Sequence, residues 1–429
     1  MKKKITSILK KDILKILSLN AVATLIKMLT SFVSIKVVAV LIGPSGIALL
    51  GQLNNFSSIF LSISTGGLNN GITKYVAENA GSSHEINIYL KTSLWIISIL
   101  SLLCGFTLIF GAGYFSVLIL HDVKYRLVMI IFGFSISFYA LNNYLVAIIN
   151  GFKQFKIFVK VNIIGSILSL TFTVILSYFY GIIGALIAAV TFQSVIFAFT
   201  LYKCYQCDWF KRENFIGKFD KIAGKKLAHY SLMSLVSAAT VPVSQIYVRS
   251  FLTEKTSLTE AGIWEGMNRI SGMYLMVIGT SLSIYYLPRL AEIKDRKNLR
   301  IEILSLYKML IPLLVIITIS IYFCRDYIVE ILFNSDFKSM NDLFLYQLIG
   351  DFFKLASWIL SFVMVAKSMT LHYVSTEVIF SISFALLAVF FINKNGSVGA
   401  TIAFAVNYFI YFIAMIFIFK KLLFSKHIR

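Results

Sequence analysis

Long apolar segments recur along the whole chain, and they restrict its fold more than any other feature of the sequence. Each is about 20 residues long or longer, which is enough for an α-helix to cross about 30 Å of hydrocarbon. Of the 429 residues, 58% are hydrophobic and 14% are charged, whereas about 25% are charged in an average soluble domain. The sequence therefore predicts an all-α polytopic membrane protein and argues against a soluble enzyme.

Hydropathy and helical periodicity predict twelve transmembrane helices. Because this number is even, we expect both ends of the chain on the same side of the membrane. The approximate residue ranges are 13–41, 46–72, 88–110, 126–150, 157–179, 181–202, 227–251, 261–287, 300–323, 343–366, 369–392 and 397–419.

The basic residues predict the orientation. The chain has 40 Lys and Arg against 19 Asp and Glu, a formal net charge of +21, which in a polar chain would suggest a nucleic-acid partner. In the twelve-span layout, 27 of the 40 fall in tails and loops on one side and 6 on the other. Because cytoplasmic loops are enriched in Lys and Arg, we expect both termini in the cytoplasm. We also expect the basic loops to contact anionic lipids, and we expect no nucleic-acid partner.

The two halves of the chain repeat short sequences at a nearly constant spacing. Gly181–Ala185 matches Gly396–Ala400 at an offset of 215 residues, and Gly46 with Ile47 matches Gly262 with Ile263 at an offset of 216. Offsets close to half the chain length indicate duplication of a six-helix unit.

The duplication predicts the domain organisation. Because six is even, both copies enter the membrane from the same side, related by a pseudo-two-fold axis along the membrane normal. We expect an N-terminal six-helix lobe at 1–202, a cytoplasmic linker at 203–226 and a C-terminal six-helix lobe at 227–429. Two such lobes would form a transporter of the rocking-bundle kind, with the substrate bound between them.

Four predicted spans carry polar side chains at helical spacing, so that each presents a polar stripe. Stripes of Ser, Thr and Gly are also typical of helix packing surfaces, and this alternative stays open for the hydroxyl residues. The stripes comprise Asn20, Thr24, Lys27, Ser31 and Ser34 in span 1; Asn55, Ser58, Ser62, Thr65 and Asn69 in span 2; Glu265, Arg269, Gly272, Thr280 and Ser283 in span 8; and Gln347, Asp351, Lys354, Trp358 and Ser361 in span 10.

Charges inside the spans favour a polar cavity. A charge at the centre of a span costs about 2.5–3.5 kcal/mol on insertion scales, so it needs a partner or water. Glu265 with Arg269, and Asp351 with Lys354, could instead neutralise each other as structural pairs within one helix. Lys27 has no acidic neighbour in its own helix, which makes it the best single candidate for a cation facing an aqueous cavity.

The intramembrane charges together predict a mildly cationic cavity, which suits an anionic head group such as a diphosphate. Arg249, at the outer end of span 7, has the alternative of snorkelling to the interface. The charges in question are Lys27, Arg249, Arg269 and Lys354 against Glu265, Asp351 and Glu377.

Several kinds of site are not expected. Cys204 and Cys207 form a single CxxC, whereas a structural zinc site needs four ligands. The sequence contains neither HExxH nor GxxxxGK[ST], which are the patterns of zinc proteases and nucleotide-driven pumps. We therefore expect no catalytic residue, no metal site and no bound cofactor.

Three groups of residues resemble the Wzx-type lipid-linked oligosaccharide flippases of the multidrug/oligosaccharidyl-lipid/polysaccharide exporter superfamily. The likeness covers essentially the whole chain and is closest to the branch that includes the flippase for the enterobacterial common antigen lipid. The groups are Gly43–Gly46 through Gln52 to Gly66–Ala77; Gly262–Gly266 with Leu287 and Pro288; and Asp342–Phe344 with Gln347–Asp351 and Lys354.

The resemblance implies twelve helices in two lobes that translocate an undecaprenyl-diphosphate-linked oligosaccharide to the periplasmic leaflet of the bacterial inner membrane, by alternating access, in O-antigen or related glycan assembly. It leaves open docking by a polysaccharide polymerase and by chain-length proteins, besides contact with membrane lipids. The branch shares Lys27, Lys36, Lys74, Arg249, Asp351, Lys354, Lys367 and Glu377 with this chain. It differs at Asn54, where it has a basic residue, and at Arg269, where it has a small polar one, so we expect a different sugar repeat.

These considerations define the predicted site. We expect the head group to be bound by Lys27, Arg249, Arg269, Lys354 and Lys74. The candidates for coupling transport to a proton or sodium gradient are Asp351, Glu377 and Glu265.

Two alternatives stay open. A drug/cation antiporter of the same superfamily would have the same fold, although a cationic cavity disfavours an organic cation. A membrane glycan polymerase or glycosyltransferase would need a sizeable soluble loop. The longest predicted outer loop, about 324–342, offers only Asp326, Glu330, Asp336 and Asp342.

Overall fold

The computed structural model describes residues 2–79 and 83–424, apart from the side chains of 2–22, 83–84, 229–230, 232–233 and 284. This part of the chain is helical and contains no β-strand. The α-helices are α1 (Lys2–Ser64), α2 (Asn69–Glu78), α3 (Ser83–Phe110), α4 (Ala112–Leu120), α5 (Arg126–Gly151), α6 (Phe155–Tyr205), α7 (Lys221–Lys255), α8 (Leu258–Ser281), α9 (Leu287–Glu292), α10 (Arg296–Phe323), α11 (Arg325–Leu332), α12 (Phe344–Ala366), α13 (Thr370–Ile418) and α14 (Lys420–Phe424). Shorter segments are the 3₁₀ turns η1 (Val123–Tyr125), η2 (Arg212–Asn214) and η4 (Ser335–Leu343) and the π-helical turn η3 (Leu282–Tyr286).

Three of the helices are each long enough for two membrane crossings and are broken at a glycine. The helices α1, α6 and α13 have 63, 51 and 49 residues, with non-helical backbone at Gly43, Gly181 and Gly396. The φ angles there are 64°, 55° and 57°, in the left-handed region that glycine adopts without the steric cost of a Cβ. Each break separates two spans that the hydropathy predicts.

The repeated pentapeptides have the same backbone geometry. Gly181 has ψ of −133° and Gly396 has ψ of −135°. The fourth residue of each pentapeptide, Gly184 or Gly399, also has the same surroundings. A Cβ on Gly184 would lie 1.8 Å from the Leu176 carbonyl oxygen, and a Cβ on Gly399 would lie 2.1 Å from the Phe391 carbonyl oxygen. Each glycine thus contacts the carbonyl eight residues earlier, on the other side of the break.

Seven helices among the described residues are long and apolar enough to cross a membrane. The chain is therefore an all-helical membrane protein. This number is lower than the twelve predicted spans because three of the seven contain a glycine break, and because α7 and α8 are not among the seven. The seven are 23–64, 85–110, 123–151, 155–205, 296–323, 335–366 and 370–418.

The chain forms two compact units. Unit 1 contains residues 1–41 and 53–239, and unit 2 contains 42–52 and 240–429. The helices α1 and α7 therefore each contribute residues to both units. The lobe boundaries expected from the sequence stay a prediction.

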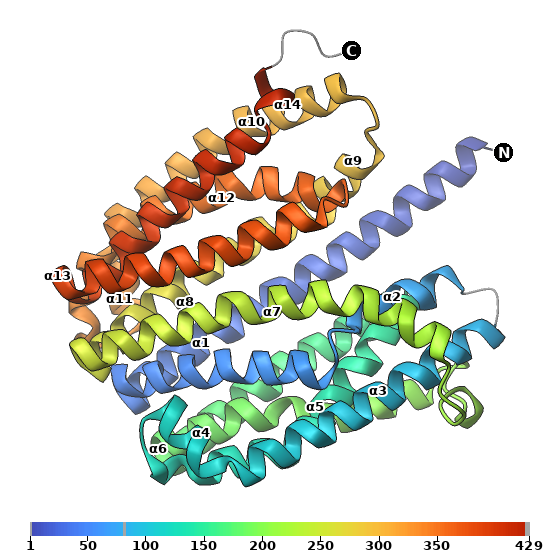
Figure 1. The fold of residues 1–429 in the computed structure, drawn as a ribbon, viewed down its shortest axis with the longest axis horizontal. Helices are drawn as coiled ribbons and strands as arrows, with labels where there is room; N and C mark the ends of the chain where they lie inside the picture. Colours follow the sequence, from blue (N-terminus) through green and yellow to red (C-terminus); the bar gives the residue numbers. More distant parts are fainter. Residues whose placement is uncertain (1, 80–82, 425–429) are drawn as a thin grey trace. The chain divides into compact units, whose positions relative to one another are not determined.

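Unit 1 is organised around α5, which packs against α2, α3 and α6 (Figure 1). The facing side chains, such as Met129, Phe132 and Tyr144, are fully buried. The Tyr144 hydroxyl donates a hydrogen bond of 2.9 Å to the Leu90 carbonyl of α3, so that burial leaves this polar group satisfied.

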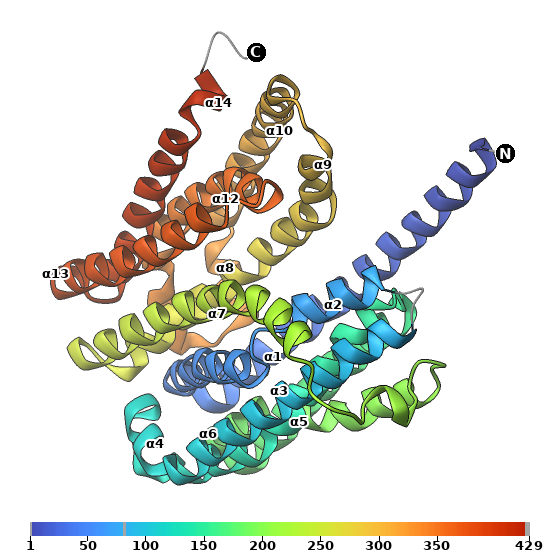
Figure 2. The same ribbon diagram turned by 45° about the vertical axis from the view of Figure 1, so that its right-hand side comes forward.

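Unit 2 is organised around α12, which packs against α9, α10 and α13 (Figure 2). Its core includes Leu355, Ile359 and Val363 of α12 together with Met415 of α13. The Tyr307 hydroxyl of α10 donates a 2.8 Å hydrogen bond to the Ala356 carbonyl. The polar residue Asp351 of α12 is also buried, and it contacts Ser271 of α8.

Within unit 2, residues 42–52 lie in very close contact with α8. A Cβ on Gly262 would lie 1.8 Å from the carbonyl oxygen of Pro44. A Cβ on Gly51 would lie 2.4 Å from the Glu265 side chain. Glycine is therefore required at position 262 for the two backbones to approach this closely, whereas a Cβ at position 51 would displace the Glu265 side chain.

We predict that Gly262→Ala destabilises the protein by about 1–3 kcal/mol, the usual cost of overpacking a tight contact. Thermal unfolding in detergent measures this effect. Gly272→Ala is the matched control on the same helix, because its Cβ would meet no heavy atom within 4 Å. Equal unfolding temperatures for the two variants would contradict the close contact.

Candidate functional site

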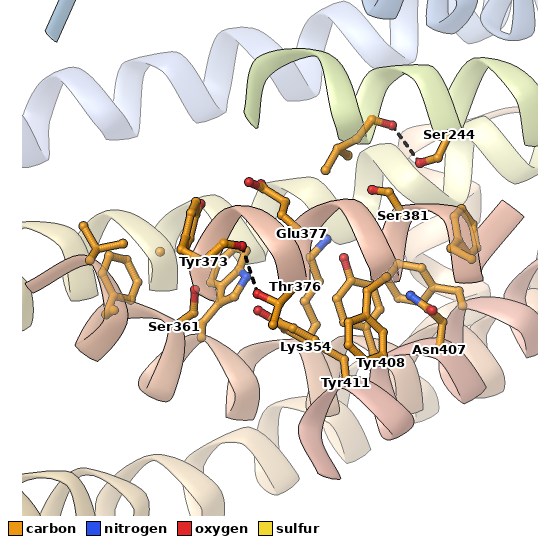
Figure 3. Close-up of a pocket in the computed structure, with 18 of the residues that line it drawn as sticks. Ser244, Lys354, Ser361, Tyr373, Thr376, Glu377, Ser381, Asn407, Tyr408 and Tyr411 are labelled. Atoms are coloured by element: carbon orange, nitrogen blue, oxygen red, sulfur yellow. Dashed lines mark hydrogen bonds between the residues drawn. The ribbon is translucent and has the colours of Figure 1, made fainter. Parts of the chain in front are cut away.

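A cavity of about 550 Å³ lies inside unit 2 and is called the unit 2 chamber below. Side chains from α7, η3 and the end of α8, α12 and both halves of α13 line it (Figure 3). Cavities of this size are typical of small-molecule sites. Its polar and aromatic lining residues are Ser244, Gln245, Thr280, Ser283, Lys354, Trp358, Ser361, Tyr373, Thr376, Glu377, Ser381, Asn407, Tyr408 and Tyr411.

Lys354 of α12 places its ammonium group among aromatic rings in this chamber. Its Nζ lies 5.1 Å from the centre of the Tyr408 ring, 5.4 Å from that of Phe404 and 5.8 Å from that of Trp358. Rings within about 6 Å attract a cation electrostatically. Among the described residues, Lys354 forms no ion pair within 4.0 Å. The ring faces thus hold a positive charge that no carboxylate neutralises directly.

Asp351 lies one turn earlier on α12, but it binds α8 rather than Lys354. Its two carboxylate oxygens accept hydrogen bonds of 2.8 and 2.7 Å from the Ser271 hydroxyl, and one oxygen also accepts a hydrogen bond from the Tyr274 hydroxyl. The Gln347 amide donates to it at 3.5 Å. The Asp351 residue is only 2% exposed. The structural pair Asp351–Lys354 that the sequence left open is therefore not formed.

The other predicted pair is present and belongs to a larger network. Arg269 Nε lies 3.3 Å from Glu265 Oε1. The other Glu265 oxygen accepts a hydrogen bond from Arg249 Nη2, and Arg249 Nη1 donates to Gln52 Oε1 at 2.8 Å. Gln52 in turn donates to Ser250 Oγ at 2.7 Å. The Glu265 carboxylate thus forms ion pairs with two guanidinium groups.

Arg249 does not snorkel, which was the alternative suggested by its position near the end of a span. The residue is 1% exposed, and its guanidinium carbon lies 5.5 Å from the centre of the Trp264 ring. A buried guanidinium is tolerated when it is paired and hydrogen-bonded. The network therefore attaches residues 42–52 to α7 and α8 within unit 2.

The remaining predicted site residues lie elsewhere. Glu377 of α13 lines the unit 2 chamber with Lys354 (Figure 3). Lys27 is exposed on α1 in unit 1, and Lys74 of α2 pairs with Glu78 at 3.5 Å. The Asn20 side chain of the first stripe is outside the described residues.

The polar stripes of spans 8 and 10 contribute directly to the chamber. Thr280 and Ser283 come from the first, and Lys354, Trp358 and Ser361 from the second. Ser283 belongs to the π-helical turn η3, a kind of irregularity found frequently at functional sites.

Residues of α13 supply much of the chamber, and of these only Glu377 was selected from the sequence. In each half of this helix the lining residues recur at helical spacing, which is the signal that could have identified them. They are Tyr373, Thr376, Glu377, Phe380, Ser381 and Phe384 before the break at Gly396, and Phe404, Asn407, Tyr408 and Tyr411 after it.

Within the part of the chain that the structure describes, no group of three or more His, Cys, Asp or Glu side chains is placed to hold a metal ion. The chamber instead offers one ammonium group, one carboxylate, hydroxyls, amides and aromatic faces. Such a lining can bind a polar ligand that carries negative charge.

Apolar helices that surround a polar chamber are typical of a membrane transporter. The family described as "Polysaccharide biosynthesis protein" matches residues 13–294. The chain therefore belongs to the polysaccharide biosynthesis protein family, as the sequence resemblance predicted. This family comprises transporters and flippases, so the chain is not an enzyme, and the alternative of a glycan polymerase or glycosyltransferase was wrong.

Curated relatives and solved structures agree with this assignment. The Lipid III flippases of Escherichia coli K12 and Shigella flexneri are each 26% identical to the chain over 396 residues, which is 92% of this chain and 94% of the relative.

The similar structures show the fold alone, because their sequence identities are low. An inward-facing MATE transporter of the MOP superfamily has a TM-score of 0.76 at 14% identity, with 94% of this chain and 96% of that one covered. The Lipid II flippase MurJ has a TM-score of 0.73 at 15% identity, covering 95% and 87%. The Vibrio cholerae MATE transporter VcmN has a TM-score of 0.69 at 16% identity, covering 99% of each.

Proposed function

We propose that the chain is a flippase for a lipid-linked oligosaccharide in the bacterial inner membrane. It moves an undecaprenyl-diphosphate-linked repeat unit of a surface glycan from the cytoplasmic to the periplasmic leaflet by alternating access. The family membership and the similarity to Lipid III flippases support this substrate class. The observation that carries the proposal is the Lys354 ammonium group in the unit 2 chamber.

The proposal includes twelve transmembrane helices in two six-helix lobes related by a pseudo-two-fold axis. The glycine breaks support the number, because counting three of the seven long helices twice and adding α7 and α8 gives twelve. The equal geometry at Gly181 and Gly396 supports the internal repeat.

The side chains that line the chamber can bind both the charge of a diphosphate and the hydroxyls of a sugar attached to it. The Lys354 ammonium can donate charge-assisted hydrogen bonds to phosphate oxygens. Hydroxyl and amide groups of Tyr373, Asn407 and Tyr411 can bond the sugar next to the diphosphate, and the Trp358 ring offers an apolar face. The polyprenyl chain stays in lipid, so the protein needs to bind only the polar head.

The other cations that the sequence predicted to bind the head group lie outside the unit 2 chamber. Arg249 and Arg269 are already bound by Glu265, so we assign them first to holding α7 and α8 together. Lys27 and Lys74 stay predictions as residues that bind the head group in unit 1.

We predict that Lys354→Ala lowers surface glycan at least about tenfold, because a hydrogen bond to a charged group contributes about 1.5–3 kcal/mol. The assay compares surface glycan with the amount of protein in the membrane fraction. Lys354→Arg should retain part of the function, since arginine keeps the charge and the stacking on aromatic rings. Lys308→Ala is the matched control, because this exposed lysine of α10 lies outside the chamber.

Normal glycan in Lys354→Ala cells would contradict the role of the chamber cation. A drug/cation antiporter makes the opposite prediction. Deleting the gene would then raise drug susceptibility and leave surface glycan intact.

Asp351 is the residue that we propose for coupling to a proton or sodium gradient, with Glu377 and Glu265 as further candidates. Its carboxylate is buried, and its hydrogen-bond donors are the hydroxyls of Ser271 and Tyr274 and the Gln347 amide, not a Lys or Arg side chain. Buried ionisable residues in membrane helices commonly belong to ion or proton pathways.

We predict that Asp351→Asn abolishes gradient-driven accumulation of flipped lipid in proteoliposomes but retains exchange at equilibrium. The amide keeps the size of the side chain and removes the charge that a coupling ion would neutralise. Asp208→Asn, in an exposed loop, serves as the control. Gradient-driven transport at the normal rate in Asp351→Asn would exclude this carboxylate.

A further inference from the structure

A second polar cavity lies inside unit 1 and is called the unit 1 pocket below. Its volume is about 540 Å³. It is formed by the second half of α1, the turn before α2, the first residues of α2, and residues of α5, α6 and the first half of α7. Its lining residues are Asn54, Ser57, Ser58, Leu61, Ser62, Thr65, Gly67, Asn69, Asn70, Tyr139, Ala189, Phe192, Ser234 and Ala238.

The lining of this pocket is polar and neutral. Its polar groups are amides and hydroxyls, and none of these lining residues, all of them described, carries a charge. The unit 2 chamber differs in having both Lys354 and Glu377. A neutral lining offers no direct counter-charge to a phosphate or to an organic cation, whereas it can exchange hydrogen bonds with uncharged hydroxyls.

Two polar atoms at the pocket lack partners within the protein. Ser57 is 8% exposed, and its hydroxyl forms no hydrogen bond. The buried Oδ1 of Asn69 also accepts none. Since most buried polar atoms in folded proteins are hydrogen-bonded, these two indicate that a ligand or water completes the site.

Other hydroxyls of the pocket are oriented as acceptors. Ser58 donates its proton to the Asn55 carbonyl at 2.8 Å, and Thr65 donates to the Leu61 carbonyl at 3.0 Å. With these protons engaged, the hydroxyl oxygens can act only as acceptors toward a ligand. A sugar ring presents several hydroxyl donors, and the rings of Tyr139 and Phe192 offer apolar faces for its C–H groups.

We infer that the unit 1 pocket binds a neutral sugar residue of the translocated head group, a hexose or an N-acetylhexosamine rather than a uronic acid. This inference rests on the proposed function and adds to it a site that selects for the glycan. The unit 2 chamber recognises the negative charge common to all polyprenyl-diphosphate lipids, and the unit 1 pocket recognises the sugar.

The test compares two lipids on the purified full chain in nanodiscs. One probe is undecaprenyl diphosphate without sugar, and the other is the lipid-linked oligosaccharide extracted from cells in which this gene is deleted. Native mass spectrometry measures the affinity for each. We expect the sugar-bearing lipid to bind the unchanged protein more tightly.

We expect Asn54→Ala and Asn69→Ala each to weaken binding of the sugar-bearing lipid about tenfold, equivalent to about 1.4 kcal/mol. Binding of undecaprenyl diphosphate should not change, which also shows that the variants are folded. Asn162→Ala is the matched control, because this exposed asparagine of α6 lies outside the pocket and bonds only its own helix. It should leave both affinities unchanged.

The outcomes separate this inference from the proposed function. If both pocket variants keep the full preference for the sugar-bearing lipid, the unit 1 pocket is not the sugar site. Equal affinities of the unchanged protein for the two lipids would also overturn the inference, while leaving the diphosphate proposal intact. Failure to bind either lipid would contradict the proposed function itself.

Discussion

A charge inside a hydrocarbon-spanning helix needs a partner or water, and this constraint explains how the polar residues of unit 2 are arranged. Glu265 is shared by Arg249 and Arg269, and Asp351 is held by hydroxyls of α8. Lys354 differs, because aromatic rings and an open chamber surround it instead of a carboxylate. The charged groups that bind each other or hydroxyls thus hold helices together, whereas the Lys354 ammonium group stays able to bind an anion.

Glycine allows the close helix contacts on which these networks depend. Left-handed glycines at 43, 181 and 396 divide the three longest helices into spans. Gly51 and Gly262 bring residues 42–52 against α8, so that Gln52 reaches Arg249. A larger residue at these positions would move Glu265 and its partners apart.

Features that lie within one helix could be predicted from the sequence, and contacts between helices could not. Helical spacing correctly placed Thr280, Lys354 and Ser361 on polar faces, and it gave the Glu265–Arg269 pair. Gln52 is 197 residues from Arg249, and Ser271 is 80 residues from Asp351. No periodicity links such residues, so the network partners were missed. The aromatic residues of α13 that line the chamber recur at helical spacing in the sequence. Their role as neighbours of the Lys354 ammonium group follows only from the structure.

Covalent capture of the substrate at the unit 2 chamber tests the central claim most directly. A photo-crosslinking p-benzoylphenylalanine replaces Ser361 in the chamber or, as a reference, the exposed Leu313 of α10. Irradiation of living cells should attach glycan-bearing lipid to the protein at position 361, and Lys354→Ala should remove the adduct. Equal yields at positions 361 and 313, or an adduct that persists without Lys354, would contradict binding of the head group in this chamber.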